Sequence, residues 1–137
     1  MANTDFYTNA FADNYRLAKS RLIIDPSDGT YNLIRIPKYA FVKDVWLQVT
    51  TASDVTPTTC TVGWLGNGET AVENGFTTTD VAEPTKTGLK RAQKDTLTTF
   101  EGKYFSGATG IITFTFAAGS ATTLGYYRVF CEYTVIH

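Results

Sequence analysis

The sequence predicts an all-β protein, an antiparallel β-sandwich that is jelly-roll-like, with about seven to eight strands and an N-terminal arm. Thr occurs 24 times among 137 residues, and its branched Cβ suits a pleated strand. The chain also contains 11 glycines, which serve the turns between strands. Apolar and polar residues alternate along several segments, and strands of this kind are best buried as two packed antiparallel sheets.

The first 20 residues differ in composition from the rest, so we expect an N-terminal arm over 1–20 and one β-sandwich domain over 21–137. The arm is polar, but it carries four aromatic side chains at spacings that one face of a short helix would give. Large aromatic side chains are poorly placed in water, so they are expected to contact either the parent domain or a neighbouring subunit. These candidate contact residues are Phe6, Tyr7, Phe11 and Tyr15.

The first strands follow the arm. Residues 21–25 form a short expected strand, which the turn from Pro26 to Gly29 ends. The side chains of residues 30–37 alternate between two faces, as in a strand. Pro37 ends this expected strand because proline has no N–H to donate to a central ladder. Residues 40–52 give the clearest strand. Its expected core face is Phe41, Val45, Leu47 and Val49, interrupted by Lys43, and its partly solvated face is Asp44, Trp46 and Gln48.

The later strands are read in the same way. Residues 58–65 place Cys60, Val62 and Trp64 on one face, while residues 89–100 allow either a turn of helix or a weak strand. Residues 103–119 give a strand, a glycine-containing turn and a second, alternating strand. Residues 126–137 alternate as far as the last residue and are expected to lie inside a sheet.

Residues 63–76, GWLGNGETAVENGF, concentrate four glycines with acidic and amide side chains. A phosphate loop is excluded because Glu69, not a lysine, follows Gly68. A calcium site remains an alternative, with oxygens from Asn67, Glu69, Glu73 and Asn74, although the spacing of a known calcium loop is missing. The preferred interpretation is a turn, in which glycines allow a left-handed backbone. We therefore predict no metal and no cofactor.

Catalytic chemistry has little support in the sequence. The only histidine, His137, is the last residue, where a general base is poorly positioned. This excludes Ser-His-Asp and Cys-His arrangements and a zinc site, so the chain is predicted not to be an enzyme. Paired acids such as Glu69 and Glu73 leave a small hydrolase as a minor hypothesis.

Charge and hydropathy restrict the partners. The net charge of −1 and the pI of about 5.7 do not favour nucleic-acid binding, and the basic run from Lys86 to Lys94 is interpreted as a solvated loop or short helix. No long apolar run and no signal peptide are present, so we expect synthesis in a cytoplasm and no membrane contact. Cys60 and Cys131 are expected as buried thiols, with a disulfide as the alternative. Trp64 is either a core residue or a platform for sugars.

Two stretches carry a resemblance to a known group of proteins. They are LIRIPKYAFVKDVWLQVTTASD, residues 33–54, and CTVGWLGNGETAVENGF, residues 60–76. The pattern resembles small structural proteins of tailed bacteriophages. The resemblance implies a virion protein, made in the host cytoplasm, that acts as a capsid decoration or cement protein without catalysis. It also implies a homo-oligomer, such as a trimer, that contacts the major capsid protein or other virion proteins. The alternative is a carbohydrate- or receptor-binding module of a phage tail or fibre, with contacts at Trp64, Asn67, Glu69 and Glu73.

Overall fold

The computed structural model describes residues 15–66, 69–76, 85–91, 103–106, 109–119 and 124–136, with the backbone alone at residues 66, 69 and 70. The described residues form strands and connections, without a helix that could cross a membrane. The strands are β1 (Arg16–Lys19), β2 (Ile23–Ile24), β3 (Gly29–Ile36), β4 (Ala40–Thr51), β5 (Thr59–Gly66), β6 (Glu69–Val72), β7 (Gly88–Arg91), β8 (Lys103–Phe105), β9 (Gly110–Ala117) and β10 (Tyr126–Val135).

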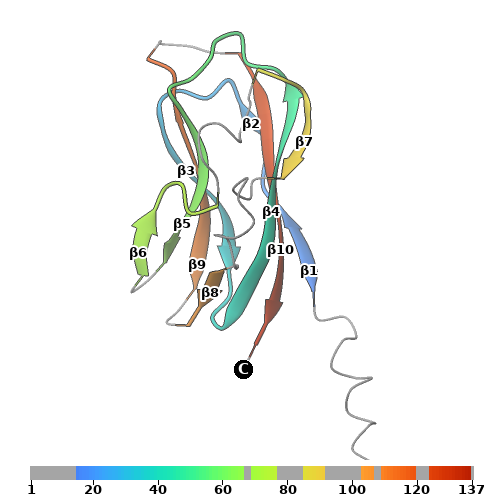
Figure 1. Ribbon diagram of the computed structural model, residues 1–137, viewed down its shortest axis with the longest axis vertical. Coiled ribbons are helices and arrows are strands. Elements are labelled where there is room, and N and C mark those ends of the chain that lie inside the picture. The colour runs from blue at the N-terminus through green and yellow to red at the C-terminus, as the bar shows by residue number, and fades with distance from the viewer. Residues whose placement is uncertain are drawn as a thin grey trace, which may run out of the picture.

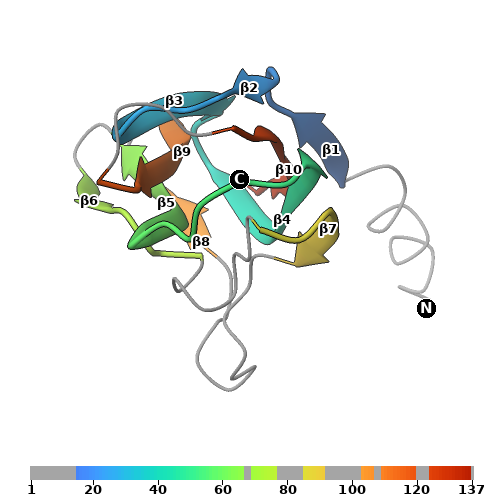
Figure 2. The ribbon, with the colours of Figure 1, turned by 90° about the horizontal axis from the view of Figure 1, so that it is seen from above.

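The strands form two antiparallel sheets that face each other (Figures 1 and 2). Sheet A has the order β1-β10-β4-β7, with β2 also on β10 and β8 also on β4, and sheet B has the order β3-β9-β5-β6. The predicted antiparallel sandwich is confirmed. The ten strands are more than the sequence predicted, because each edge of sheet A consists of two short strands in line. Along β10, β1 pairs with residues 130–133 and β2 with residues 126–127.

The hydrophobic core lies between the two sheets. The rings of Phe114 and Phe116 on β9 and of Tyr127 on β10 are fully buried. The Tyr127 ring centroid lies 5.7 Å from that of Phe114 and 6.1 Å from that of Phe116, so aromatic contacts join sheet A to sheet B. Cys60 on β5 and Cys131 on β10 are buried and free, as the thiol interpretation predicted.

The predicted core face of β4 is wrong at its start. Val42 is fully buried, whereas Phe41 is only half-buried. The cause is a β-bulge: Asp44 pairs with Glu132 and Val42 with Tyr133, which leaves Lys43 as an extra residue on β4. A bulge reverses which side chains point inward along the strand. Lys43, expected as an interruption of the core face, is therefore the point where the alternation changes phase.

Part of the expected arm belongs to sheet A. Residues 16–19 form β1, and Ser20 fixes the end of this strand to β10. The Ser20 N–H donates to the Val129 carbonyl at 2.8 Å, and the Val129 N–H donates to the Ser20 hydroxyl at 2.9 Å. Residues 1–14 lie outside the described part. For residues 89–100 the sequence allowed either a turn of helix or a weak strand. Residues 89–91 belong to strand β7, and the rest of this stretch lies outside the described residues.

Candidate interaction surface

The glycine-rich stretch of residues 63–76 is a β-hairpin that closes on the core. Gly63 on β5 lies so close to the chain after β6 that a Cβ there would overlap the carbonyl oxygens of Val72 and Glu73. Phe76 is fully buried, and its N–H donates to the Val62 carbonyl at 3.0 Å. The close approach of two backbones, rather than a ligand, therefore explains the glycine at position 63.

Trp64 packs against residues of this same region. Its ring lies 5.1 Å from the Phe76 ring in an edge-on arrangement, and it also covers Gly75, where a Cβ would meet the indole. The Lys103 ammonium lies 5.0 Å from the indole centroid. Trp64 is half-buried against the core cluster, as the interpretation as a core residue predicted.

Only part of the other candidate loop residues belongs to the described structure. Glu73 is exposed in the turn after β6, and Glu69 begins β6. Asn67 and the Glu69 side chain lie outside the described part. Within the ranges that the structure describes, no three His, Cys, Asp or Glu side chains gather as metal ligands would.

A groove crosses the outer face of sheet A, on the side opposite the core. Trp46 and Gln48 of β4 point outward after the bulge at Lys43, and there Phe130 pairs with Trp46 and Leu89 with Gln48. The groove has a volume of about 380 Å³. We call it the outer groove; its residues are Leu17, Trp46, Gln48, Leu89, Phe130 and Glu132. They come from β1, β10, β4 and β7, and so from every position across the sheet.

The outer groove is apolar and open to solvent. Leu17 is 69% exposed and Leu89 is 61% exposed, and between them lie the half-buried rings of Trp46 and Phe130. Single exposed leucines are ordinary, but a contiguous apolar patch with polar residues at its border marks an interaction site.

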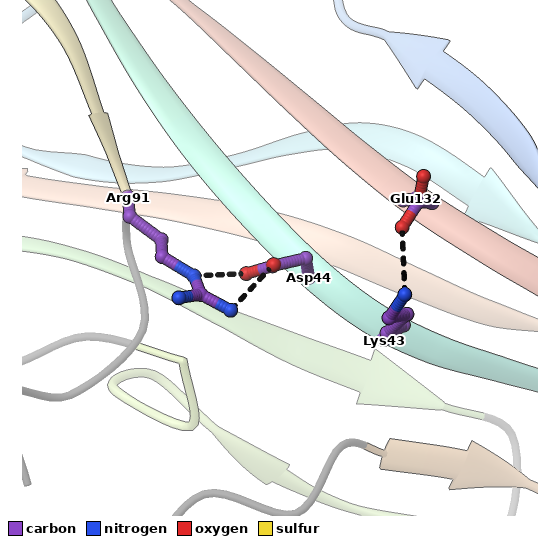
Figure 3. A network of polar contacts seen from close by, with 4 residues as sticks. All are labelled: Lys43, Asp44, Arg91 and Glu132. Atoms are coloured by element: carbon purple, nitrogen blue, oxygen red, sulfur yellow. Dashed lines mark hydrogen bonds and ion pairs between the residues drawn. The ribbon is translucent and has the colours of Figure 1, made fainter. Parts of the chain in front are cut away.

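Two ion pairs join β4 to its neighbours β7 and β10 (Figure 3), and one of them includes Glu132 of the groove. Asp44 and Glu132 face each other on β4 and β10, where two carboxylates would repel. Arg91 donates from Nε and Nη2 to the two oxygens of Asp44 at 2.8 and 2.7 Å, and the Lys43 ammonium lies 3.6 Å from Glu132. The hydrogen bond to Asp44 raises the pKa of Arg91.

The described rim of the groove carries a net positive charge. Lys19 pairs in register with Phe130, and Arg128 pairs with Gln48, so both cations border the groove. Together with Lys43 and Arg91 they outnumber the carboxylates of Asp44 and Glu132. A segment that combines aromatic rings with acidic residues therefore matches this surface in both respects.

Tyr15 is the one candidate arm residue that the structure describes. Its side chain is 50% exposed, and its ring centroid lies 4.8 Å from the Lys43 ammonium. Tyr15 therefore extends from the start of β1 over the outer face of sheet A. The other arm candidates, Phe6, Tyr7 and Phe11, fall outside the described residues.

Most residues of the outer groove were missed by sequence reasoning. Trp46 and Gln48 were assigned to the partly solvated face of their strand, which is correct. Leu17, Leu89 and Phe130 come from distant parts of the chain and meet only through the pairing of β1, β10, β4 and β7. No local pattern contains that pairing.

No protein-family model matches the chain, and no curated protein matches it. Two solved structures are similar in fold. A chain of the acidic stable capsid structure of Helicobacter pylori bacteriophage KHP30 is 16% identical, with a TM-score of 0.55 over 88% of this chain and 87% of that chain. A chain of the cyanophage Pam1 capsid asymmetric unit is 17% identical, with a TM-score of 0.59 over 92% of this chain and 88% of that chain. The fold is thus one that occurs in bacteriophage capsids, in agreement with the resemblance to phage structural proteins.

Proposed function

We propose that the chain is a non-enzymatic structural protein of a bacteriophage virion that decorates or cements the head. The observation that carries the proposal is the likeness in fold to chains of two capsid structures, which extends over 88% and 92% of this chain. The outer groove adds a surface suited to adhesion, since it is apolar, open and bordered by cations.

The order of the strands supports a jelly-roll assignment within the sandwich class. In each sheet a late strand lies between two early ones: β10 separates β1 from β4, and β9 separates β3 from β5. A chain that winds in this way forms two Greek keys, which is the jelly-roll arrangement of many capsid domains.

A head decoration or cement protein acts by repeated contacts. A capsid presents the same site many times, so a closed homo-oligomer such as a trimer binds with avidity even where each contact is weak. Under this proposal the chain binds other copies of itself and the capsid proteins beneath it, and it performs no reaction.

The decisive experiment removes the chain from the virion. Particles of the encoding phage that lack this protein are expected to assemble, to lose a layer of density on the head in electron micrographs, and to break at lower temperature. Purified chain added back restores both properties. Wild-type heads that contain no copies of the chain, or depleted heads that do not bind it, would contradict the proposal.

The carbohydrate-binding alternative has less support from the geometry. The Trp64 ring already contacts Phe76, Gly75 and Lys103, whereas a sugar platform needs an open aromatic face. Glycan binding that is lost in Trp64→Ala while the fold remains intact would favour this alternative over capsid binding.

A further inference from the structure

We propose that the outer groove receives the aromatic N-terminal segment, residues 1–14, of a neighbouring copy of the chain. This inference rests on the proposed function, because it names the contact by which copies associate. Every copy then gives one segment and accepts another, so that the exchange closes into a ring.

The composition of the segment matches the groove. Residues 1–14 contain Phe6, Tyr7 and Phe11 as large apolar side chains, and their only charged side chains are Asp5 and Asp13. The groove offers apolar walls for the rings, and cations at its border for the two carboxylates. Opposite charges at the border of an interface favour the correct partner and increase the rate of encounter.

The area of the contact is close to that of a standard interface. An aromatic side chain buries about 150–250 Å², so three rings remove about 450–750 Å² of the segment from water. A standard stable interface buries about 800 Å² on each partner. One exchanged segment therefore approaches this value, and a closed ring gives every copy two such contacts.

The direction of the chain favours a neighbouring copy over the same molecule. β1 begins at Arg16, which pairs with Tyr133 near the end of β10, so the chain enters β1 at that end of the sheet. Tyr15 lies over Lys43 at the same end, in the path that a segment returning to its own groove would take. Fourteen extended residues span up to about 50 Å, which is enough to reach a second molecule.

The test uses two complementary variants and measures their mass in solution by light scattering. The first variant lacks residues 1–14 but keeps β1, so it has a groove and no segment. The second carries Leu17→Glu and Leu89→Glu, which place negative charge in the groove and leave the segment intact. Both leucines are mostly exposed, so these substitutions leave the core unchanged. Leu124→Glu, at a site that is 56% exposed and outside the groove, is the matched control.

Wild type and the Leu124→Glu control are expected to be oligomers of the same mass, and each of the two test variants alone a monomer. An equal mixture of the two variants is expected to form a one-to-one dimer, because the segment of the second fits the groove of the first. Three outcomes would overturn the proposal: the mixture stays monomeric, one test variant retains the wild-type mass, or the wild type itself is a monomer. A monomeric wild type is the result expected if the segment binds the groove of its own molecule.

A spectroscopic measurement tests the same contact without relying on assembly. A peptide of residues 1–14 added to the variant without the segment is expected to shift the emission of Trp46 to shorter wavelength. The peptide with alanine at Phe6, Tyr7 and Phe11 should not shift it, and the Trp46→Phe background should remove the response. No shift with the native peptide would overturn the proposal.

The outcomes separate this inference from the proposed function. If depleted heads bind the monomeric variant without residues 1–14 as well as wild type, the virion role stands and the exchange does not explain it. If the variants form the expected dimer but no form of the chain binds heads, the exchange stands and the virion role fails.

Discussion

Replacing Gly63 with alanine is expected to destabilise the chain more than any other single added methyl group on the hairpin of residues 63–76. A Cβ at this position would overlap the carbonyl oxygens of Val72 and Glu73 and would lie 2.5 Å from the carbonyl carbon of Glu73. Carbon atoms in ordinary contact are about 3.5–4.0 Å apart. Because the obstacle is backbone on both sides, β5 and the chain after β6 must separate by about 1 Å.

The cost follows from what that separation disturbs. Forcing a methyl group into a packed site costs about 1–3 kcal/mol by itself. The same movement pulls on Phe76, which is fully buried and donates its N–H to Val62 at 3.0 Å. Complete loss of a buried Phe side chain costs about 3–5 kcal/mol, so partial loss brings the total to about 3–5 kcal/mol. This is a large fraction of the 5–15 kcal/mol by which domains are usually stable.

The assay is unfolding in guanidinium chloride, followed by tryptophan fluorescence. Gly119→Ala is the matched control: its φ is +76° and nothing lies within 4 Å of its Cβ, so only backbone strain of about 1–2 kcal/mol applies. Gly75→Ala should fall between the two, because its Cβ meets the Trp64 side chain, which is able to rotate. A Gly63→Ala protein no less stable than Gly119→Ala would refute the reasoning.

Three further predictions concern groups elsewhere in the sandwich. Burial raises the pKa of Cys60 and of Cys131 from 9.0 to about 12, so the folded chain retains protons that the unfolded chain releases above pH 9. The contribution of each buried thiol to the free energy of unfolding should therefore be fully present below pH 9. Between pH 9 and pH 12 it should fall by about 1.4 kcal/mol per pH unit for each thiol, which urea midpoints would measure. The fall should be less steep when both cysteines are replaced by alanine. Asp44→Ala should cost about 1–2 kcal/mol in the same assay, because a nearly buried carboxylate that receives two hydrogen bonds from Arg91 is lost; an unchanged midpoint would contradict that geometry. Phe114→Ala should cost about 3–5 kcal/mol, since its ring contacts both sheets of the core, and a cost below 1 kcal/mol would mean that the ring is not central.

The sandwich class could be predicted from the sequence because it depends on local alternation, which is a property of neighbouring residues. Leu47 and Val49 both lie where alternation placed them, on the core side of their strand. The error at Phe41 has the same origin. Alternation assumes one residue per pleat, and the extra residue at Lys43 becomes visible only when β4 is aligned with β10.

The outer groove could not be predicted because its walls depend on which strands become neighbours. Leu17 and Leu89 are more than seventy positions apart in the sequence and meet across β10 and β4. The hairpin of residues 63–76 is a second example. The turn that its glycines predicted falls on residues 67–68, which lie outside the described part, and the reason for Gly63, two backbones in contact, required the fold.

The divided edges of sheet A restrict how far another chain can extend that sheet. A long exposed edge strand invites another chain to extend the sheet, and repetition of that step produces fibres. In the described part of sheet A, one edge consists of β1 and β2, with four and two residues, and the other of β7 and β8, with four and three. An incoming strand would therefore lose its hydrogen-bonding partners after a few residues. Any contact between copies on the sheet A side is thereby left to side chains on its outer face, where geometry limits the number of partners.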